Sequence, residues 1–535
     1  MNFPYTLYNK QLIAAEEIIK LFLQGYPHVL LDAPTGSGKS IIALYVAIKL
    51  QELEDKGKLR IGYKNDLKVG LITKSINLQE QYIESEVYLD NLMGKTNYAC
   101  HVSPGIVYDS DKCFMDRNDC ISKCAYLTKR RNWQKSNLRL TNFAFAIEAC
   151  DLICNKSGKD GNRSDLLIID ESHSIANELM ERSVIKFDLE QIKSLSKIDE
   201  NNKSKIAIEQ FEYVQYLLKS HLKNFMLIPN VQLKKKLKIP KTVFSSSYDY
   251  FIGMANDKSY TKRERLLYKQ AGIECSILSD FLDILINSNK DSKFVLSNSN
   301  EYKAIFAHDV AEYGLFKKAN HFLHMTATFC GKDQYMKNLG LDDLQVVTMK
   351  SDFPLENRPN YVFPMGKIDQ IDQDLVDGLD AIIENYPNLR GNIHSVSYDR
   401  ATTIKRLSKF GHLIEIPTTR QEINRLMKSN KKDMIIVSPA ISTGYDFKDD
   451  LARFQIILKV PYKFMGDQWV KMLYKYNKDF YFNEALCELI QMSGRGVRNK
   501  DDYCDTFIVD SRFGGMAWFQ RNDIPKWFAD SLIDV

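Results

Sequence analysis

The sequence of 535 residues predicts an α/β protein with two parallel β-sheets, each in a domain of its own. Short apolar runs alternate with helix-like segments through residues 1–95, and Val69–Thr73 is one such run. The same alternation returns over residues 390–515, where further apolar runs are spaced as in βα units. In between lie a cysteine-rich stretch at 97–131 and long charged helical segments at 181–317. We therefore expect two insertions within the first domain.

The composition is that of a globular protein and excludes several other classes. Hydrophobic residues make up 44% of the chain, enough for a sizeable core. No apolar run approaches the roughly 18 residues that span a bilayer, and residues 1–4 do not begin a secretion signal. The net charge of +5 is too small to indicate nucleic-acid binding by itself. We expect an intracellular monomer, in the cytoplasm of a prokaryote or of a virus-infected cell, without a membrane partner.

A glycine-rich segment at residues 33–40, Ala-Pro-Thr-Gly-Ser-Gly-Lys-Ser, follows the apolar run His28–Leu31 and precedes the helical segment 41–48. This order of strand, loop and helix is that of a phosphate-binding loop. Its glycines let backbone N–H groups approach phosphate oxygens, and its lysine offers a positive charge to the β- and γ-phosphates. The residues expected to contact the nucleotide are Gly36, Ser37, Gly38, Lys39 and Ser40, and Ser40 is also expected to bind Mg²⁺.

Two carboxylates follow the next strong strand signal. Asp170 and Glu171 come directly after the apolar run Leu166–Ile169, at the carboxyl end of a predicted parallel strand, where α/β sheets bind ligands. We expect Asp170 to bind the Mg²⁺ ion that accompanies the nucleotide. Glu171 is the natural group to orient and deprotonate the attacking water, because phosphoryl transfer to water needs an in-line nucleophile.

A second set of candidate catalytic residues lies near the carboxyl end of the chain. Gln491 precedes Arg495 and Arg498, which are three residues apart and would project from one face of a helix. Arginine can neutralise charge that builds up on the γ-phosphoryl oxygens, and an arginine from a separate domain makes hydrolysis depend on domain closure. We therefore predict an ATP site split between two domains, in which these residues act with Glu171. A solvated basic helix end is the alternative.

Four of the ten cysteines fall within residues 100–124, with the spacing C-x12-C-x6-C-x3-C. They are Cys100, Cys113, Cys120 and Cys124. Four thiolates suit one metal centre, either a [4Fe-4S] cluster or a tetrahedral zinc ion, and the spacing does not choose between these. Cys150 falls in an apolar helical segment at 143–154, so we assign it to the core and not to the metal centre.

Together these motifs resemble those of the XPD/DinG type of superfamily 2 helicase, which carries an iron-sulfur cluster, and the resemblance covers nearly the whole chain. It also rests on further segments, which are Gln11, Thr73 with Leu78 and Gln79, Asp170–His173, Met325–Thr328, Ser351–Arg358 and Ser442–Phe447. At one position the chain departs from the family pattern, because Thr443 replaces the usual glutamate.

The resemblance assigns expected roles to particular residues. It implies an adenine contact from Gln11 and nucleotide contacts from Gly444 and Asp446. It implies that the segment around Thr73 touches the DNA backbone and that Met325–Thr328 couples ATP to DNA. The residues that flank the first and last cysteines resemble those of the family, which favours iron-sulfur over zinc.

The resemblance also implies a domain plan with two RecA-like motor domains. The expected ranges are 1–95, 138–180 and 318–350 for motor domain 1, 96–137 for the iron-sulfur cluster domain, 181–317 for the helical arch domain, and 351–535 for motor domain 2. Because only ten residues precede Gln11, we expect no N-terminal nuclease domain of the kind that some DinG-like proteins carry.

Two basic segments become candidate DNA contacts under this resemblance. We expect Lys129–Arg131 to contact phosphates and Trp133 to stack on a base, with a solvated helix face as the alternative. Lys234–Lys238 would line a DNA pore formed by the arch, or lie in an exposed loop. His173 would couple ATP to DNA from within its motif.

The implied function is that of an ATP-dependent DNA helicase that uses ATP, Mg²⁺ and a [4Fe-4S] cluster. It would move 5′ to 3′ along single-stranded DNA and unwind forked or tailed duplex DNA in repair or replication, with RNA–DNA hybrids as a further substrate. One alternative is a translocase of the same fold that remodels protein–DNA or RNA–DNA structures without processive unwinding. Another is a nucleic-acid-binding scaffold with a vestigial ATPase, against which the intact Lys39, Glu171, Arg495 and Arg498 argue.

Overall fold

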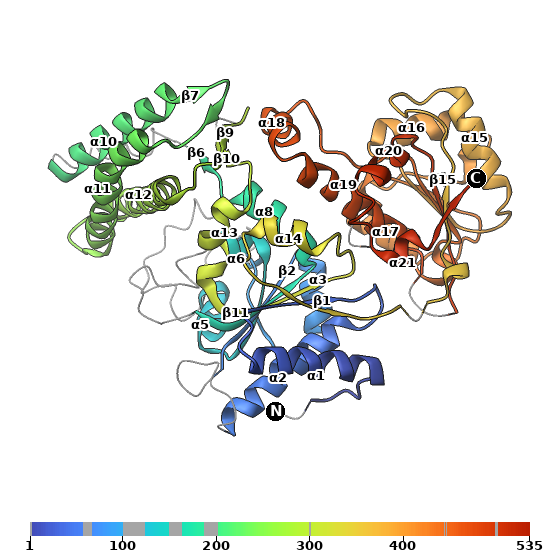
Figure 1. Cartoon of the computed structure of the whole chain (residues 1–535), viewed down its shortest axis with the longest axis horizontal. Coiled ribbons are helices and arrows are strands. Elements are labelled where there is room, and N and C mark those ends of the chain that lie inside the picture. Colours follow the sequence, from blue (N-terminus) through green and yellow to red (C-terminus); the bar gives the residue numbers. More distant parts are fainter. Residues whose placement is uncertain are drawn as a thin grey trace.

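The computed structural model describes two large α/β lobes and a third, mainly helical body. The described residues are 3–56, 67–99, 124–148, 163–186, 202–298, 301–351, 353–442, 445, 447–497 and 501–535. Figure 1 shows the first lobe at the lower centre, the second lobe at the right and the helical body at the upper left. None of the described helices is both long and apolar enough to cross a membrane.

The first lobe, here called lobe 1, is built around a parallel sheet with the strand order β12-β1-β11-β5-β2-β4-β3. Its strands are β1 (His28–Asp32), β2 (Val69–Thr73), β3 (Asp90–Asn91), β4 (Leu138–Asn142), β5 (Ser164–Asp170), β11 (Ala319–Thr326) and β12 (Gln345–Thr348). Strands β2 and β5 are buried along their whole length, as expected for parallel strands that are covered by helices on both faces.

Helices cover both faces of this sheet. They are α1 (Asn9–Leu23), α2 (Lys39–Asp55), α3 (Ile76–Ile83), α5 (Ala125–Lys135), α6 (Phe143–Glu148), α8 (Ile175–Arg182), α13 (His308–Gly314) and α14 (Lys332–Leu339). Helices α1 and α2 share one apolar core with alternate residues of β1 and β2. Helices α6, α8 and α13 share the core on the other face, which continues into the helical body.

The helical body, here called the arch, contains three long helices and a small sheet. Its helices are α10 (Asn202–Ser220), α11 (Val231–Asn256) and α12 (Lys262–Asn287). Its antiparallel sheet contains β6 (Ile185–Lys186), β7 (Leu222–Lys223), β8 (Met226–Leu227), β9 (Phe294–Leu296) and β10 (Glu301–Ala304). The sequence indicated the helices but not this sheet, because strands of two to four residues are too short to show an alternating pattern.

The second lobe, here called lobe 2, has a parallel sheet in the order β15-β16-β14-β17-β18-β13-β19. Its strands are β13 (Asn360–Val362), β14 (Gly391–His394), β15 (Ile414–Glu415), β16 (Ile435–Val437), β17 (Phe454–Ile457), β18 (Asp505–Ile508) and β19 (Leu532–Asp534). Its helices are α15 (Gln373–Glu384), α16 (Tyr398–Leu407), α17 (Arg420–Met427), α18 (Gln468–Tyr476), α19 (Lys478–Ser493), α20 (Arg512–Phe519) and α21 (Lys526–Ala529). The predicted pair of parallel sheets is therefore confirmed.

Helix α18 joins lobe 2 to the arch, and Figure 1 shows it between the two bodies. The indole Nε1 of Trp469 donates to the carbonyl oxygen of Ala304, at the end of β10, over 2.8 Å. The amide Nδ2 of Asn477 donates to the carbonyl oxygen of Ile305 over 3.0 Å. Both side chains are buried, so lobe 2 contacts the arch as well as lobe 1.

Candidate nucleotide site between the two lobes

The glycine-rich loop lies where the sequence predicts it, between the end of β1 and the start of α2. Gly36 and Gly38 have φ values of 75° and 82°, a left-handed conformation that favours glycine. A Cβ atom on Gly38 would lie 2.4 Å from Nε2 of Gln11. The same Nε2 atom donates to the carbonyl oxygen of Ser37 over 2.9 Å. Gln11 therefore packs directly against the loop, beside the position expected for a nucleotide.

Lys39 is the first residue of α2 and folds back over the loop. Its Nζ atom donates to the carbonyl oxygens of Ala33 and Pro34 over 3.0 and 3.2 Å. These bonds hold the ammonium group within the cradle of backbone atoms, where phosphate oxygens would replace the carbonyl acceptors. Burial raises the pKa of Asp32 to about 7, and the charge of Lys39 only partly opposes this shift.

The two predicted magnesium ligands are joined by a residue that the sequence did not single out. The phenol oxygen of Tyr82, in α3, donates to Oδ2 of Asp170 over 3.0 Å and is also hydrogen-bonded to the hydroxyl of Ser40. Asp170 is buried, and burial raises its pKa to about 6. The hydroxyl of Ser40 and the carboxylate of Asp170 are thus hydrogen-bonded to the same phenol group. Oxygen atoms of these two kinds are the ligands that Mg²⁺ prefers. No spacing pattern in the sequence connects Tyr82 with either ligand.

Glu171 adopts a strained backbone conformation that places it between the lobes. Its φ of 55° is in the left-handed region, which costs a residue other than glycine about 1–3 kcal/mol. Its Oε2 atom accepts a hydrogen bond of 3.1 Å from Nε2 of Gln491, in α19 of lobe 2. Burial pushes the pKa of Glu171 upward, but His173, Lys39, Lys74 and Arg495 outweigh this effect and hold it below its ordinary value. The carboxylate is therefore ionised at neutral pH.

His173 connects three parts of the site. Its Nδ1 atom lies 3.0 Å from Oγ1 of Thr326, at the end of β11, and its Nε2 atom lies 2.8 Å from Nε2 of Gln491. Burial lowers the pKa of His173 to about 4, so the imidazole is neutral at pH 7. A neutral ring can accept the amide proton of Gln491 at Nε2 while its Nδ1 proton is donated to Thr326. His173 thus contacts the segment Met325–Thr328, and its coupling role stays a prediction.

Lobe 2 approaches the loop of lobe 1 through the end of α19. A Cβ atom on Gly494 would lie in van der Waals contact with Oγ1 of Thr35, at 3.7 Å. The guanidinium group of Arg495 donates from Nη1 to the carbonyl oxygen of Tyr445 over 3.0 Å. The prediction that Arg495 lies on a helix is wrong, because α19 ends at Ser493. Glycines at 494 and 496 favour this helix end.

Several predicted site residues lie outside the described part of the chain. They are Arg498, Gly444, Asp446, Cys100, Cys113 and Cys120. Of the four predicted cluster ligands only Cys124 is described, directly before α5. Within the described ranges no group of three or more His, Cys, Asp or Glu side chains could hold a metal ion. The metal centre therefore stays a prediction.

The predicted base contact of Trp133 is wrong, and one residue of the segment expected to touch the DNA backbone, Gln79, points inward. Trp133 is buried, its Nε1 atom donates to the carbonyl oxygen of Leu140 over 3.0 Å, and the guanidinium of Arg139 lies 5.0 Å from its ring. Gln79 is also buried, where it donates to Oδ1 of Asn91 over 2.8 Å. Lys74 directly follows β2, is exposed and takes the place of Gln79 as the candidate contact. Its position after a parallel strand is the signal that could have identified it.

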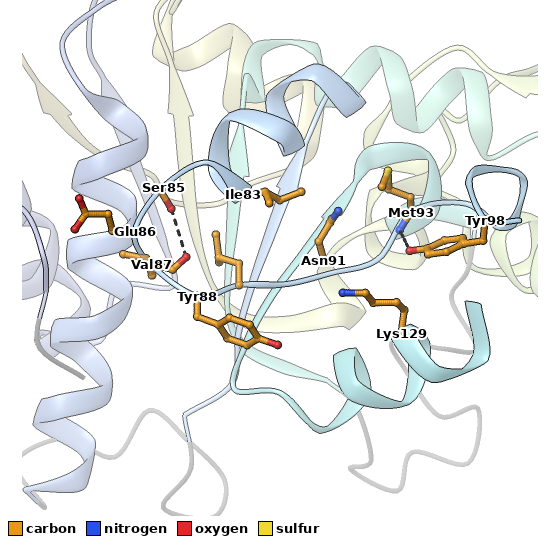
Figure 2. A pocket seen from close by; sticks show the side chains of 10 residues that line it. Ile83, Ser85, Glu86, Val87, Tyr88, Asn91, Met93, Tyr98 and Lys129 are labelled. Carbon is orange, nitrogen blue, oxygen red and sulfur yellow. Dashed lines mark hydrogen bonds between the residues drawn. The ribbon is translucent and has the colours of Figure 1, made fainter. Parts of the chain in front are cut away.

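A cavity of about 500 Å³ lies along the outer edge of the lobe 1 sheet, away from the glycine-rich loop. Figure 2 shows its lining, which comes from the end of α3, from the segment around β3 and from α5. The Oη atom of Tyr98 accepts a hydrogen bond of 3.1 Å from the backbone N–H of Met93. Tyr88 is 68% exposed, and the predicted phosphate contact Lys129 reaches the same cavity from α5. An exposed tyrosine and a lysine thus line the same cavity.

Two protein-family models match separate parts of this chain. A model described as "Type III restriction enzyme, res subunit" matches residues 4–211. A model described as "Helicase C-terminal domain" matches residues 398–531. The first match includes the glycine-rich loop, Asp170 and Glu171, and the second includes Gln491 and Arg495.

Curated relatives match shorter regions. The XPD helicase subunit of general transcription and DNA repair factor IIH from Schizosaccharomyces pombe is 27% identical over 42% of this chain and 29% of its own length. The ATP-dependent DNA helicase CHL1 of Scheffersomyces stipitis is 21% identical over 49% of this chain and 37% of its own length. The chain thus spans less than half the length of these relatives.

Solved structures match nearly the full length. A structure titled as an XPD helicase has a TM-score of 0.57 at 14% identity and covers 99% of this chain and 100% of its own. The structure of S. tokodaii Xpd4 has a TM-score of 0.55 at 14% identity, with the same coverage. The two parallel-sheet lobes fit two RecA-like domains, as in these XPD structures. The two family models, the XPD and CHL1 relatives and the XPD structures support the predicted resemblance to the XPD/DinG type of superfamily 2 helicase, while the predicted iron-sulfur insertion lies largely outside the described residues.

Proposed function

We propose that this chain is an ATP-driven motor that moves along single-stranded DNA and separates the strands of duplex DNA. The observation that carries this proposal is the contact of 3.1 Å between Glu171 in lobe 1 and Gln491 in lobe 2. A residue placed to activate water is thereby held by the other lobe, so hydrolysis depends on how the lobes are arranged. The names of the relatives, which include an ATP-dependent DNA helicase, support the same activity.

The chemistry that we propose uses residues from both lobes. The loop and Lys39 hold the triphosphate, and Ser40 and Asp170 hold Mg²⁺, which neutralises phosphate charge when it is bound. The ionised carboxylate of Glu171 accepts a proton from the attacking water. Arg495, together with the predicted Arg498, stabilises the charge on the γ-phosphoryl oxygens. Arg495 can reach a nucleotide because Gly494 already lies close to Thr35.

The coupling of hydrolysis to movement would pass through His173. His173 contacts Thr326 at the end of β11 in lobe 1 and Gln491 on α19 in lobe 2. Loss of the γ-phosphate would therefore change hydrogen bonds that connect the two lobes. The ion pairs Arg420–Glu80 and Lys463–Glu181 cross between the lobes over 3.0 and 2.9 Å. Both pairs are partly exposed, so each contributes about 0–1 kcal/mol, which lets the lobes separate in every cycle.

The proposed DNA contacts fall into three groups. Lys74 follows β2, and Lys129 with Tyr88 offers phosphate pairing next to an exposed aromatic ring. Lys235, Lys236 and Lys238 are exposed on α11, while Leu237 between them is buried, so this segment is a helix and not a loop. Docking of α18 on the arch would close a passage around one strand.

We further propose a [4Fe-4S] cluster on Cys100, Cys113, Cys120 and Cys124, and movement in the 5′ to 3′ direction. The support for both is the resemblance to the XPD/DinG type. A brown protein with an absorbance band of sulfide-to-iron charge transfer would support the cluster. A colourless protein that contains one zinc ion after anaerobic purification would contradict it.

The direct test of the motor is strand displacement on duplexes with a 5′ or a 3′ single-stranded tail, made of DNA or RNA. We expect ATP-dependent displacement of DNA from the 5′-tailed duplex and little from the 3′-tailed one. DNA-stimulated ATP hydrolysis without displacement from any duplex would favour the remodelling translocase. No hydrolysis at all would contradict the proposal.

A further inference from the structure

Two cysteines from different lobes lie against each other next to the nucleotide site. Cys330 follows β11 in lobe 1, and Cys487 lies on α19 in lobe 2. Their Sγ atoms are 3.1 Å apart, and both side chains are buried. Even carbon atoms make their best contact at about 3.5–4.0 Å, and an S–S bond measures about 2.05 Å. The sulfur atoms therefore need to approach by only about 1 Å to form a bond.

The backbone around both cysteines is held by contacts across the same interface. Nδ2 of Asn483, one turn earlier on α19, donates to the carbonyl oxygen of Cys330 over 3.1 Å. The Sγ atom of Cys487 lies 3.8 Å from the carbonyl oxygen of Thr328. A Cβ atom on Gly331 would lie 2.1 Å from Oδ1 of Asp523, also in lobe 2. The segment that follows β11 is thus fixed against lobe 2, which keeps the sulfur atoms facing each other.

We propose that Cys330 and Cys487 form a disulfide bond on exposure to peroxide, and that this bond locks the two lobes together. One thiol reacts with hydrogen peroxide to give a sulfenic acid and water, and the second thiol then displaces a second water to give the disulfide. The two thiols lose two electrons in total, and one peroxide molecule becomes two water molecules. A dithiol reductant reverses the reaction by exchange.

The position of the pair explains why the bond would stop the motor. Cys487 precedes Gln491 by four residues, one helical turn on α19, so both side chains face lobe 1. A bond from Cys487 to the segment after β11 would tie together the two elements that meet at His173. The formation of the bond does not depend on the proposed function, whereas its effect on turnover rests on it.

The environment also determines when the thiols can react. The hydrogen bond to Cys330, followed by burial, raises the pKa of the Cys487 thiol well above its ordinary value. A protonated, buried thiol reacts slowly with peroxide. Peroxide therefore reaches the pair when thermal fluctuations part the lobes, with or without turnover, and the next closure brings the sulfur atoms together.

The bond itself is tested on the full chain treated with hydrogen peroxide and then with N-ethylmaleimide, followed by tryptic digestion and mass spectrometry without reductant. Trypsin releases residues 319–332, with Cys330, and residues 479–495, with Cys487, as peptides that contain one cysteine each. We expect these two peptides to be joined. They should also be joined in Cys504→Ala, a control in which another buried cysteine is removed. Peptides that stay separate under peroxide would overturn the proposal.

DNA-stimulated ATP hydrolysis tests the lock. We expect peroxide to abolish turnover in the wild type and in Cys504→Ala, and dithiothreitol to restore it. Cys330→Ala and Cys487→Ala should keep their turnover. An equal loss of turnover in all four proteins would show that the disulfide bond does not stop the motor, even if the joined peptides are detected. If the untreated wild type has no turnover, the proposed function fails, and the peptide measurement still decides the bond.

Discussion

Nε2 of Gln491 lies 3.1 Å from Oε2 of Glu171, although these residues belong to different lobes. The same amide nitrogen lies 2.8 Å from Nε2 of His173. One side chain of lobe 2 therefore holds two residues of the Asp170–His173 motif of lobe 1. A contact of this kind makes the catalytic geometry depend on closure of the lobes.

Replacing Gln491 by alanine should lower hydrolysis and uncouple it from DNA. The substitution leaves Glu171 and His173 without their partner from lobe 2, and positioning contacts of this type are worth about tenfold to a hundredfold in rate. We expect kcat to fall while the KM for ATP changes little, because Gln491 does not line the glycine-rich loop. Asn424→Ala, on α17 of the same lobe, is the control. A large rise in KM with unchanged kcat would contradict this role.

Lys39→Ala and Glu171→Gln should both abolish DNA-stimulated hydrolysis, for different reasons. The first removes the charge that holds the phosphates, so ATP binding is lost. The second keeps ATP binding but removes the base, with a loss of about 10²-fold or more. Titration with a fluorescent ATP analogue separates the two effects. Lys56→Ala, at the exposed end of α2, should behave as wild type. Normal turnover in Glu171→Gln would refute its assignment.

Tyr82→Phe should raise the concentration of Mg²⁺ that hydrolysis requires. The substitution removes the hydroxyl that contacts both Asp170 and Ser40, so the two ligands lose their common partner. A lost buried hydrogen bond also costs about 1–3 kcal/mol of folding stability. We expect a magnesium titration midpoint several-fold higher, whereas Tyr216→Phe, on the exposed surface of α10, should not shift it. Identical titrations in both variants would show that Tyr82 serves folding alone.

Substitutions of Trp133 and Lys129, which both lie on α5, should distinguish a loss of stability from a loss of DNA binding. Trp133→Ala removes a buried ring and its hydrogen bond, which should cost about 3–5 kcal/mol of unfolding free energy. Lys129→Ala should leave stability unchanged, weaken binding of single-stranded DNA, and reduce the salt dependence of binding by about one unit of slope. A stable Trp133→Ala variant with weakened DNA binding would restore the original prediction of base stacking.

His28 should make the wild type sensitive to acid. Burial, followed by the nearby His321, lowers the pKa of His28 to about 4 from its ordinary 6.5. The unfolded chain takes up a proton between these values that the folded chain does not, so stability is full above about pH 6.5 and falls as the pH drops toward 4. Each pH unit within this window costs about 1.4 kcal/mol at most.

The comparison that isolates this effect is between the wild type and His28→Gln, each unfolded with urea at about pH 7.5 and 5.5. Glutamine can keep a hydrogen bond to His324, which lies 3.2 Å from His28. We expect the variant to lose about 1 kcal/mol less than the wild type on acidification. His412→Gln, at an exposed position of lobe 2, should lose as much as the wild type. If His28→Gln lost more stability than the wild type on acidification, the proposed effect of His28 would be contradicted.

The sequence predicted those parts of the site that are encoded locally. The glycine-rich loop and Asp170 with Glu171 each follow a strand directly, so a short motif determines both their conformation and their position in the sheet. A site split between the two lobes was expected from their separate motifs, but the contact between Gln491 and Glu171 was not.

Other features could not be predicted because they depend on tertiary contacts. Tyr82 and Asp170 are 88 residues apart, and Cys330 and Cys487 are 157 apart, without any spacing pattern that joins them. The basic neighbours of Trp133 suggested a surface position, but α5 packs this side chain inward together with Tyr126. The spacing of Arg495 and Arg498 suggested that both lie on a helix. The glycines at 494 and 496 indicate instead that α19 ends before Arg495.

The measurement that most directly tests the split site is single-turnover ATP hydrolysis by Arg495→Ala in the presence of single-stranded DNA. The control Arg425→Ala lies on the surface of α17 in the same lobe. We expect Arg495→Ala to bind ATP like the wild type and to hydrolyse it at least about tenfold more slowly. Equal rates in Arg495→Ala, Arg425→Ala and the wild type would contradict an ATP site completed by lobe 2.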